Sequence, residues 1–434
     1  MSEHDGDRSI PQAPVEAARP AADRADLAVK PPFAAMAPLA GSADRAPGLD
    51  TLRALAILLV FVYHYRVFVS REAGFGLFSI FGWVGVDLFF VLSGYLIAGQ
   101  LLAGTVRGRA LSLPAFYARR ALRTLPLFWA VLAAYFLFPA AMGGREPPPL
   151  WRFLTFTQNF GLQPGTAFSH AWSLCIEEQF YLVLPALLLA GLGLRLGRRS
   201  GWALLGTLIL LGMTARGVLW SRYGLESTGR VDDYYPWIYY ATLCRFDEFL
   251  PGVAIAMLQH LHPDAWQRLT RHGRLLFAAG VAATAAVLYG AWQHYEAPGV
   301  GYYFFMTTFG YSLIAMAFGV LVLAALSPGN LLSRWRVPGA AALAAWSYAI
   351  YLSHKAVGVI VKRETLDWHP APWLLFAAVA TASLLVGWLL HRAVEMPFMR
   401  LRQRWVPSSF NRAAAAGDAR EPGLTQSAPA SQRT

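Results

Sequence analysis

The chain has 434 residues, of which 56% are hydrophobic and only 14% are charged. An average soluble domain has roughly 25% charged residues, so this composition excludes an ordinary soluble protein and indicates a polytopic membrane protein. The net charge of +12 does not indicate nucleic-acid binding, because the arginines concentrate in short loops between apolar runs, where they set topology. Cys175 and Cys244 lie in apolar segments without metal-ligand spacing, so we expect neither a disulfide framework nor a metal site.

Both ends of the chain differ in composition from its centre. Residues 1–44 are rich in Ala, Pro, Asp and Arg, without an apolar run long enough for a signal peptide, and predict a disordered cytoplasmic tail. Residues 406–434 are rich in Ala, Ser and Pro and predict a second disordered cytoplasmic tail. Residues 45–405 are therefore expected to form one transmembrane domain.

Ten apolar runs lie between these tails, each near the roughly 20 residues that a helix needs to cross a bilayer. The predicted spans are about 50–69, 80–102, 120–142, 172–193, 201–220, 237–258, 275–293, 302–326, 342–360 and 373–394. Counting Lys and Arg in alternate loops gives 18 on one side and 8 on the other. The positive-inside rule then places both termini in the cytoplasm. We expect an all-α, multi-pass protein of the cell (inner) membrane.

The first span carries Arg53 and His64 in an otherwise apolar run. They are 11 positions apart, which puts both side chains on one helix face about 16 Å apart. A protonatable group in hydrocarbon is costly, so this face should line a polar cavity. The alternative is a His hydrogen-bonded within the bundle and an Arg that snorkels to the surface.

Ionisable residues of five predicted spans fall at a similar depth. They are His64, Asp87, Glu177 with Glu178, Arg245 and His354. Unpaired charges are costly in a bilayer, so the simplest arrangement has these residues converge on a central polar cavity, with Ser93, Glu248 and Tyr351 as further candidates. For His170, beside Trp172, we expect instead a loop or aromatic-belt role.

Several of these candidates also have a structural interpretation. Arg245 and Glu248 are three residues apart and can form an ion pair within one helix. Tyr351 and His354 belong to a polar stripe that suits an interhelical seam as well as a ligand site. Asp87 lies among small residues that favour close helix packing.

The polar residues fall in motifs that occur in a defined order. These are Arg53-x10-His64, GWVGVDLFFVLSGYLI (82–97), FYARRALRTLP (116–126), WSLCIEEQFY (172–181), CRFDEFLPG (244–252), WSYAIYLSH (346–354) and VEMP (394–397). The ordered set resembles the acyltransferase-3 family of membrane O-acyltransferases over about residues 48–400. The resemblance implies transfer of an acyl group, usually acetyl, from cytoplasmic acyl-CoA to a hydroxyl of a saccharide, cell-surface glycan or secondary metabolite. Some relatives carry an additional extracytoplasmic hydrolase-like domain, so it stays open whether a separate partner completes the reaction.

The chemistry of the candidate residues fits that class. A hydroxyl needs a base, and an imidazole with a pKa near 6.5 is well matched to taking its proton. His64 is the candidate base, or the group that is itself transiently acylated. Glu177 is expected to orient the imidazole as a carboxylate does in a catalytic triad, and Glu178 is the weaker candidate because adjacent helix positions diverge by about 100°.

Acetyl-CoA or another acyl-CoA is the expected donor substrate, and its phosphates need cationic partners. The candidates are Arg119, Arg120 and Arg123, which can form forked hydrogen bonds with phosphate, although the same arginines can serve topology alone. Arg53 lies at the same level and either reaches the pyrophosphate or snorkels.

Two other classes of protein would use similar residues. A proton-coupled transporter or exporter also places His, Glu and Arg near the midplane, but the sequence has no internal repeat and no paired broken spans. A non-catalytic sensor or scaffold would not need the ionisable cluster to be intact.

Overall fold

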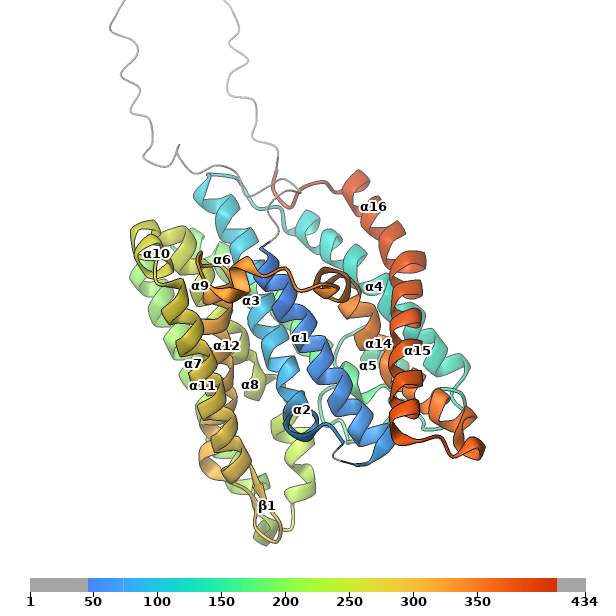
Figure 1. Cartoon of the computed structure of the whole chain (residues 1–434). Helices are drawn as coiled ribbons and strands as arrows, with labels where there is room; N and C mark the ends of the chain where they lie inside the picture. The colour runs from blue at the N-terminus through green and yellow to red at the C-terminus, as the bar shows by residue number, and fades with distance from the viewer. Residues whose placement is uncertain (1–45, 73, 412–434) are drawn as a thin grey trace, which may run out of the picture. The chain divides into compact units, whose positions relative to one another are not determined.

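The structure is a computed structural model that describes residues 46–72 and 74–411, which form a bundle of helices (Figure 1). The long helices are α1 Pro47–His64, α3 Gly85–Val106, α4 Leu113–Leu137, α6 Trp172–Gly193, α7 Arg198–Tyr223, α9 Leu250–Leu261, α11 Gly273–His294, α12 Tyr311–Ala325, α14 Ala340–Glu364, α15 Pro372–Leu390 and α16 Met396–Trp405. Within the described residues, eight helical stretches are long and apolar enough to cross a membrane.

Short elements connect or extend these helices. They are η1 Tyr65–Ser70, α2 Gly76–Phe81, η2 Gly82–Val84, α5 Leu150–Leu154, η3 Ser169–Ala171, η4 Glu226–Thr228, η5 Val231–Asp233, η6 Tyr235–Tyr239, α8 Thr242–Arg245, η7 Phe246–Phe249, α10 Pro263–Thr270, η8 Met306–Gly310, α13 Leu331–Arg334, η9 Leu366–Trp368 and η10 His391–Glu395. The strands β1 (Glu296–Ala297) and β2 (Gly301–Tyr302) form a small antiparallel hairpin in which Glu296 pairs with Tyr302.

Eight of the ten predicted spans are confirmed as long apolar helices, and the other two need comment. The predicted span 342–360 is a helix, α14, but it is not among the eight helices long and apolar enough to cross a membrane. The prediction of one continuous helix over 237–258 is wrong, because the chain there is divided into η6, α8, η7 and α9.

The helix over residues 237–258 is broken by the local backbone, and buried side chains bond the carbonyl groups that the break leaves free. Ala241 is extended, and Pro251 starts α9 as a new helix, as proline does best in a first turn. The carbonyl groups freed by the break accept hydrogen bonds from buried guanidinium groups. Nη1 of Arg245 donates to Tyr239 O at 3.1 Å, and Nη1 of Arg216 donates to Cys244 O at 2.5 Å. Irregular backbone at membrane depth requires such internal partners.

Helix α3 lies at the centre of the bundle, with α1, α9 and α12 packed around it (Figure 1). It is apolar on all sides, as expected for a helix without a lipid-facing side. Two glycines allow the backbones to touch: a Cβ at Gly94 would overlap the carbonyl of Phe249, and one at Gly252 would overlap that of Val91. Helix α3 therefore fixes the position of the 244–252 motif.

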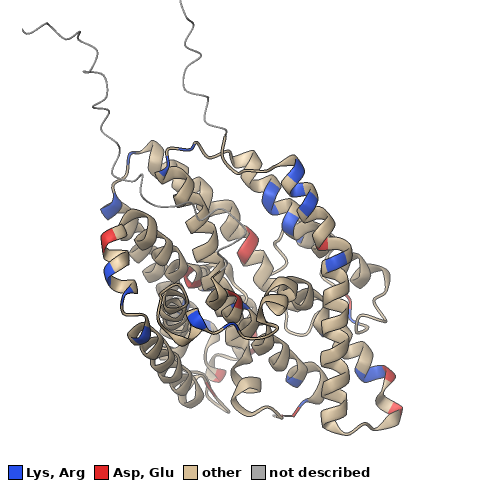
Figure 2. Ribbon diagram, turned by 45° about the horizontal axis from the view of Figure 1, so that its top comes forward, with Lys and Arg blue, Asp and Glu red and all other residues tan. Residues whose placement is uncertain are grey.

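The two ends of the bundle can be told apart by the ends of α1. We call the end at which α1 begins, near Pro47 and Arg53, the arginine end, and the end near His64 the histidine end. In Figure 2 several Lys and Arg positions gather at the upper right, in the region that Figure 1 gives to α4 and α16.

Residues 406–411, which were expected to begin the C-terminal tail, instead pair with the loop between α3 and α4. The amide of Ser112 donates to Ser409 O at 3.0 Å, and that of Asn411 donates to Ala110 O at 3.0 Å. The predicted tails over 1–44 and from 412 on lie outside the described residues.

Candidate active site

Three histidines from distant parts of the chain lie together at the histidine end. His64 ends α1, His170 lies in η3 and His354 lies in α14. Nδ1 of His64 is 2.7 Å from Nε2 of His354. The ring centroid of His170 lies 5.9 Å from that of His64 and 5.4 Å from that of His354. His170 is buried, so its expected loop or aromatic-belt role is wrong: η3 turns the ring against the other two histidines.

The hydrogen bonds of His354 determine the protonation of His64. Nδ1 of His354 lies 2.9 Å from the carbonyl oxygen of Ile350, and a carbonyl only accepts, so this nitrogen carries a proton. A neutral imidazole has one N–H, so Nε2 of His354 accepts and Nδ1 of His64 donates to it. Nε2 of His64 then keeps a free lone pair, which a general base needs.

Lys355 follows His354 in α14 and adds an amino group to the cluster. Its Nζ donates to Oγ of Ser169 at 3.0 Å and lies 4.1 Å from the centroid of the Phe68 ring. A cavity of about 10 Å³, roughly the room for one water molecule, is lined by His64, His354 and Lys355 among apolar side chains. This histidine cavity thus has a cationic donor beside two imidazoles.

A second cavity of about 320 Å³ lies toward the arginine end, and we call it the arginine cavity. A volume of this order suits part of a small-molecule ligand. Its polar lining consists of Arg53, Ser93, Gln100, Arg120, Arg123, Thr124, Ser173, Glu177, Tyr181, Ser347, Tyr348, Tyr351 and Arg402. Of the residues expected to converge on one polar cavity, Ser93, Glu177 and Tyr351 line this cavity, whereas His64 and His354 line the histidine cavity. The donor-site candidates Arg53, Arg120 and Arg123 also line the arginine cavity.

Glu177 is held inside the arginine cavity by two hydroxyl groups. Its Oε1 accepts hydrogen bonds from Ser93 and Tyr181, and Oγ of Ser93 also accepts from the Tyr181 hydroxyl at 3.2 Å. Glu177 was expected to orient the imidazole of His64, but Nδ1 of His64 is hydrogen-bonded to His354 instead. Sequence spacing could not show that α14, and not α6, packs against this part of α1.

Two other candidate site residues, Glu178 and Arg119, do not line the arginine cavity. Glu178 is not among its lining residues, in line with the divergence of about 100° between adjacent helix positions. Arg119 donates through Nη1 to the carbonyl of Val406, so this guanidinium ties α4 to the segment after α16.

Tyr351 separates the two cavities. On the side of the arginine cavity its hydroxyl donates to His170 O at 2.6 Å and lies 2.5 Å from Oγ of Ser173. Its ring lies 5.7 Å from the ring of His170 and 6.1 Å from that of His354, measured between centroids. The arginine cavity therefore ends against a tyrosine that touches the histidine cluster.

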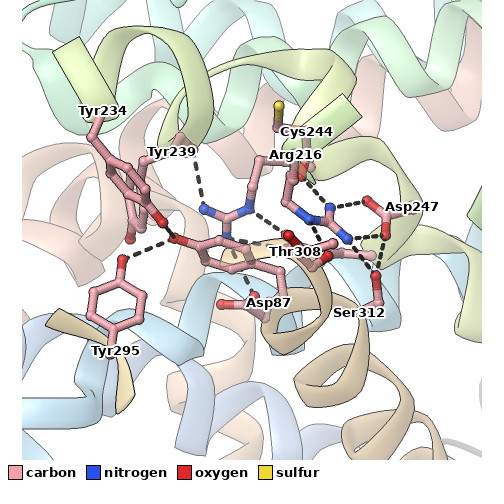
Figure 3. A network of polar contacts seen from close by, with 12 residues as sticks. Asp87, Arg216, Tyr234, Tyr239, Cys244, Asp247, Tyr295, Thr308 and Ser312 are labelled. Carbon is pink, nitrogen blue, oxygen red and sulfur yellow. Dashed lines mark hydrogen bonds and ion pairs between the residues drawn. The ribbon is translucent and has the colours of Figure 1, made fainter. Parts of the chain in front are cut away.

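Asp87, Arg245 and Glu248 form a fully buried ionic network, of which Figure 3 labels Asp87. Arg245 pairs with Asp87 at 3.3 Å and with Glu248. Its guanidinium carbon lies 4.2 Å from the ring centroid of Tyr311 and 4.7 Å from that of Tyr239. These residues line neither cavity, in contrast to their expected place in a polar cavity. Arg245 and Glu248 instead form the ion pair that their spacing of three residues allows.

A second buried ion pair continues this network. Nη1 of Arg216 lies 2.7 Å from Oδ1 of Asp247, and Nη2 donates to Oδ2 at 3.0 Å and to Oγ of Ser312 at 2.6 Å (Figure 3). Arg216 was not singled out from the sequence, although an arginine in the middle of the apolar run 201–220 was the available signal. Together the two arginines fix the broken 244–252 motif against α3, α7 and α12.

These features describe a membrane-embedded helical protein with a histidine cluster and an arginine-lined cavity. The model of the acyltransferase-3 family, described as an acyltransferase domain, matches residues 47–392. The chain belongs to this family, and within its described residues it has eight helices long and apolar enough for a multi-pass membrane protein.

Three relatives are described as O-acetyltransferases. The chain is 30% identical over 379 residues to the putative peptidoglycan O-acetyltransferase YrhL of Bacillus subtilis, with 81% of this chain and 54% of that protein covered. It is 28% identical to the peptidoglycan O-acetyltransferase OatA of Listeria monocytogenes, with 82% and 56% covered, and 23% identical to the O-acetyltransferase OatA of Staphylococcus aureus, with 82% and 57% covered. The chain thus spans about half the length of these relatives. No solved structure matches it.

Proposed function

We propose that this protein is an acyl-CoA-dependent O-acyltransferase of the cell membrane that moves an acyl group, usually acetyl, to a hydroxyl of a saccharide or cell-surface glycan. One observation carries the proposal: a cavity lined by Arg53, Arg120 and Arg123 ends at Tyr351, whose ring lies near His354. His354 in turn accepts a hydrogen bond from the His64 imidazole, whose Nε2 is free to accept a proton. The peptidoglycan named for YrhL and for OatA of Listeria monocytogenes makes a glycan the first acceptor class to test.

The donor enters at the arginine end, which faces the cytoplasm in this proposal. Phosphates of CoA meet the guanidinium groups, which form forked hydrogen bonds with phosphate oxygens. The pantetheine arm then extends along the face of α1 that carries Arg53 and His64. The two residues are 11 positions apart, about 16 Å of helix rise, which is of the order of the length of that arm. The side chain of Tyr351 must change its rotamer for the thioester to reach the imidazole of His64.

At the histidine end the acceptor hydroxyl approaches Nε2 of His64. This nitrogen takes the hydroxyl proton while the acceptor oxygen attacks the thioester carbonyl. A carbon–oxygen bond forms, the carbon–sulfur bond breaks, and the thiolate leaves. The imidazolium returns its proton to the thiolate, so the products are the acyl ester and free CoA.

A covalent route uses the same residues in two steps. Nε2 of His64 itself attacks the thioester carbonyl, the carbon–sulfur bond breaks, and the thiolate leaves while the Nδ1 proton of the acyl-imidazolium passes to His354 and from there to the thiolate. The acceptor hydroxyl then attacks the acyl group, the carbon–nitrogen bond breaks, and the imidazole of His64 takes the hydroxyl proton. In this route the lone pair of Nε2 is the nucleophile and not the base. Trapping of an acyl group on His64 in the absence of acceptor distinguishes the two routes.

The test is transfer by the full chain, purified into lipid nanodiscs, with acetyl-CoA as donor. His64→Ala should lose transfer by roughly 10²–10⁴-fold, the usual contribution of a general base, while it still binds acetyl-CoA. The matched control is His294→Ala, since His294 is exposed at the end of α11. In cells, a deletion strain should lose one acyl ester from its glycans by mass spectrometry, and the parental gene should restore it.

The alternative of a proton-coupled transporter predicts a different set of results. A transporter using the same residues need not bind acetyl-CoA, and its deletion need not remove an acyl ester. Transfer by folded His64→Ala protein at the parental rate would overturn the assignment of His64.

A further inference from the structure

The segment after the last long apolar helix closes the arginine end. We call residues 396–411, which comprise α16 and the chain that follows, the C-terminal strap. Helix α16 packs against α4, and the two lie side by side in Figure 1. Beyond α16 the strap pairs with residues 110–112, and Oγ of Ser409 accepts a hydrogen bond from Gln100, a residue of the arginine cavity, at 3.2 Å.

The strap is seated by packing as well as by hydrogen bonds. The ring of Phe410 lies directly over Gly104 of α3, where any Cβ would overlap the ring. Arg119 of α4 donates to the carbonyl of Val406. These contacts hold α16 in one position against the mouth of the arginine cavity.

One side chain of the strap reaches into the cavity itself. Arg402 lines the arginine cavity together with Arg53, Arg120 and Arg123. Its Nε is shut off from solvent and has no hydrogen-bond partner among the described residues. Its neighbour Arg404, two residues on, is exposed and is not part of the lining.

The charges that face this cavity do not balance. Four guanidinium groups line it, whereas Glu177 is its single lining carboxylate and already accepts two hydrogen bonds from hydroxyls. Within the described part of the chain, none of the four arginines forms an ion pair. Partly buried cations are costly without counter-charge, so the cavity is built for a ligand with several negative charges.

We infer that Arg402 is a phosphate-binding residue and that the C-terminal strap forms one wall of the donor site. This inference rests on the proposed function and extends it: the donor's phosphates are bound jointly by α1, α4 and α16. Phosphate oxyanions fit because guanidinium groups bind them in a bidentate manner. The same chemistry could come from a nucleotide or from a phospholipid headgroup.

The experiment measures ligand binding to the full chain in nanodiscs of phosphatidylcholine. The probes are acetyl-CoA, adenosine 3′,5′-bisphosphate and S-acetylpantetheine, of which the last has no phosphate. Arg402→Gln should weaken binding of the two phosphorylated probes roughly 10- to 100-fold, as expected for lost charged hydrogen bonds, and leave S-acetylpantetheine unchanged. Arg404→Gln is the matched control on the same helix and should bind all three as the parent does.

The outcomes separate the inference from the proposed function. Equal affinity of parent and Arg402→Gln for both phosphorylated probes overturns the inference and leaves the function standing. Weakened phosphate binding without any acyl transfer by the parent supports the inference and overturns the function. If parental protein binds acetyl-CoA only weakly and loses that binding when phosphatidylglycerol is added to the nanodisc, a lipid phosphate is the ligand, and the assignment of Arg402 to the donor is overturned.

A second variant tests the strap without changing the cavity's charge. Phe410→Ala removes the ring that lies over Gly104 and should speed dissociation of acetyl-CoA several-fold, because α16 is then less firmly held. Thermal unfolding of each variant, compared with the parent, shows that the loss of binding is not a loss of folding. Unchanged dissociation from well-folded Phe410→Ala protein would contradict the role of the strap.

Discussion

Nδ1 of His64 and Nε2 of His354 lie 2.7 Å apart, and the other ring nitrogen of His354 is bonded to the carbonyl of Ile350. A chain of two donated hydrogen bonds therefore ends on a backbone carbonyl, where a catalytic triad ends on a carboxylate. Because the final acceptor belongs to α14 itself, the helix that carries His354 also orients its ring.

The first prediction separates the hydrogen bond of His354 from its bulk. In His354→Leu, Nδ1 of His64 loses its acceptor, so the tautomer with a free Nε2 is no longer favoured and the transfer rate should fall on the order of 10²-fold or more. In His354→Gln, a side-chain carbonyl can still accept that proton, and a larger part of the rate should remain. The measurement is kcat in nanodiscs, with nitrogen NMR of labelled histidine to report which ring nitrogen of His64 is protonated. Equal rates for the Leu variant and the parent would rule out this positioning role.

The second prediction concerns the arginines of α4 that line the cavity. Arg120→Ala or Arg123→Ala should weaken donor binding by about 1.5–3 kcal/mol per lost charged hydrogen bond, with membrane insertion unchanged. Arg109→Ala is the comparison, since Arg109 is exposed in the loop before α4 and does not line the cavity. An unchanged donor KM in both cavity variants would support the alternative that these arginines serve topology alone.

The third prediction follows from the position of Glu177 among guanidinium groups. Glu177→Gln keeps an oxygen for Ser93 and Tyr181 but removes the lining carboxylate, so the affinity for a phosphorylated donor should rise a few-fold and kcat should fall less than in His64→Ala. Glu178→Gln, outside the lining, should leave donor affinity as it is. A kcat loss in Glu177→Gln as large as that of His64→Ala would restore a direct catalytic role for this carboxylate.

The fourth prediction concerns stability. Arg216→Met leaves Asp247 buried without its cation, and breaking a buried pair from one side costs about 3–5 kcal/mol. The variant should therefore unfold at a clearly lower temperature in detergent. Replacing both partners, in Arg216→Met with Asp247→Leu, should recover part of the loss, since no charge is then left unpaired. A single variant as stable as the parent would show that the pair does not hold the 244–252 motif.

The extent to which the sequence predicts this structure differs between the helices and the site. Runs of about 20 apolar residues identify spans because a bilayer leaves the backbone no other partner, and eight of the ten predictions held for that reason. The run 237–258 was apolar enough but is broken, since its carbonyls are bonded by Arg216 and Arg245 and not by the next turn.

In the candidate site, too, the sequence predicts local geometry but not the contacts between distant segments. The spacing of Arg53 and His64 predicts one helix face, because helical periodicity is local. The pairing of His64 with His354 and the burial of His170 depend on which helices are neighbours, and spacing within one helix carries no such information. The sequence does not single out Arg402, because the fold of the strap back onto α4 follows from contacts at Gly104 and Val406 that sequence alone does not reveal.

The two cavities share no lining residue among those described. The hydroxyl of Tyr351, at the end of the arginine cavity, is hydrogen-bonded to the carbonyl of His170 and to Oγ of Ser173. A protein that passes an acyl group from one side of a membrane toward the other must not also conduct protons or ions. With the Tyr351 side chain in this position the two cavities are separate, so on the proposed function an acyl group can pass between them only when Tyr351 moves. On that proposal the substrate that moves Tyr351 also fills the space it leaves, so leakage of protons or ions is limited to the time of transfer.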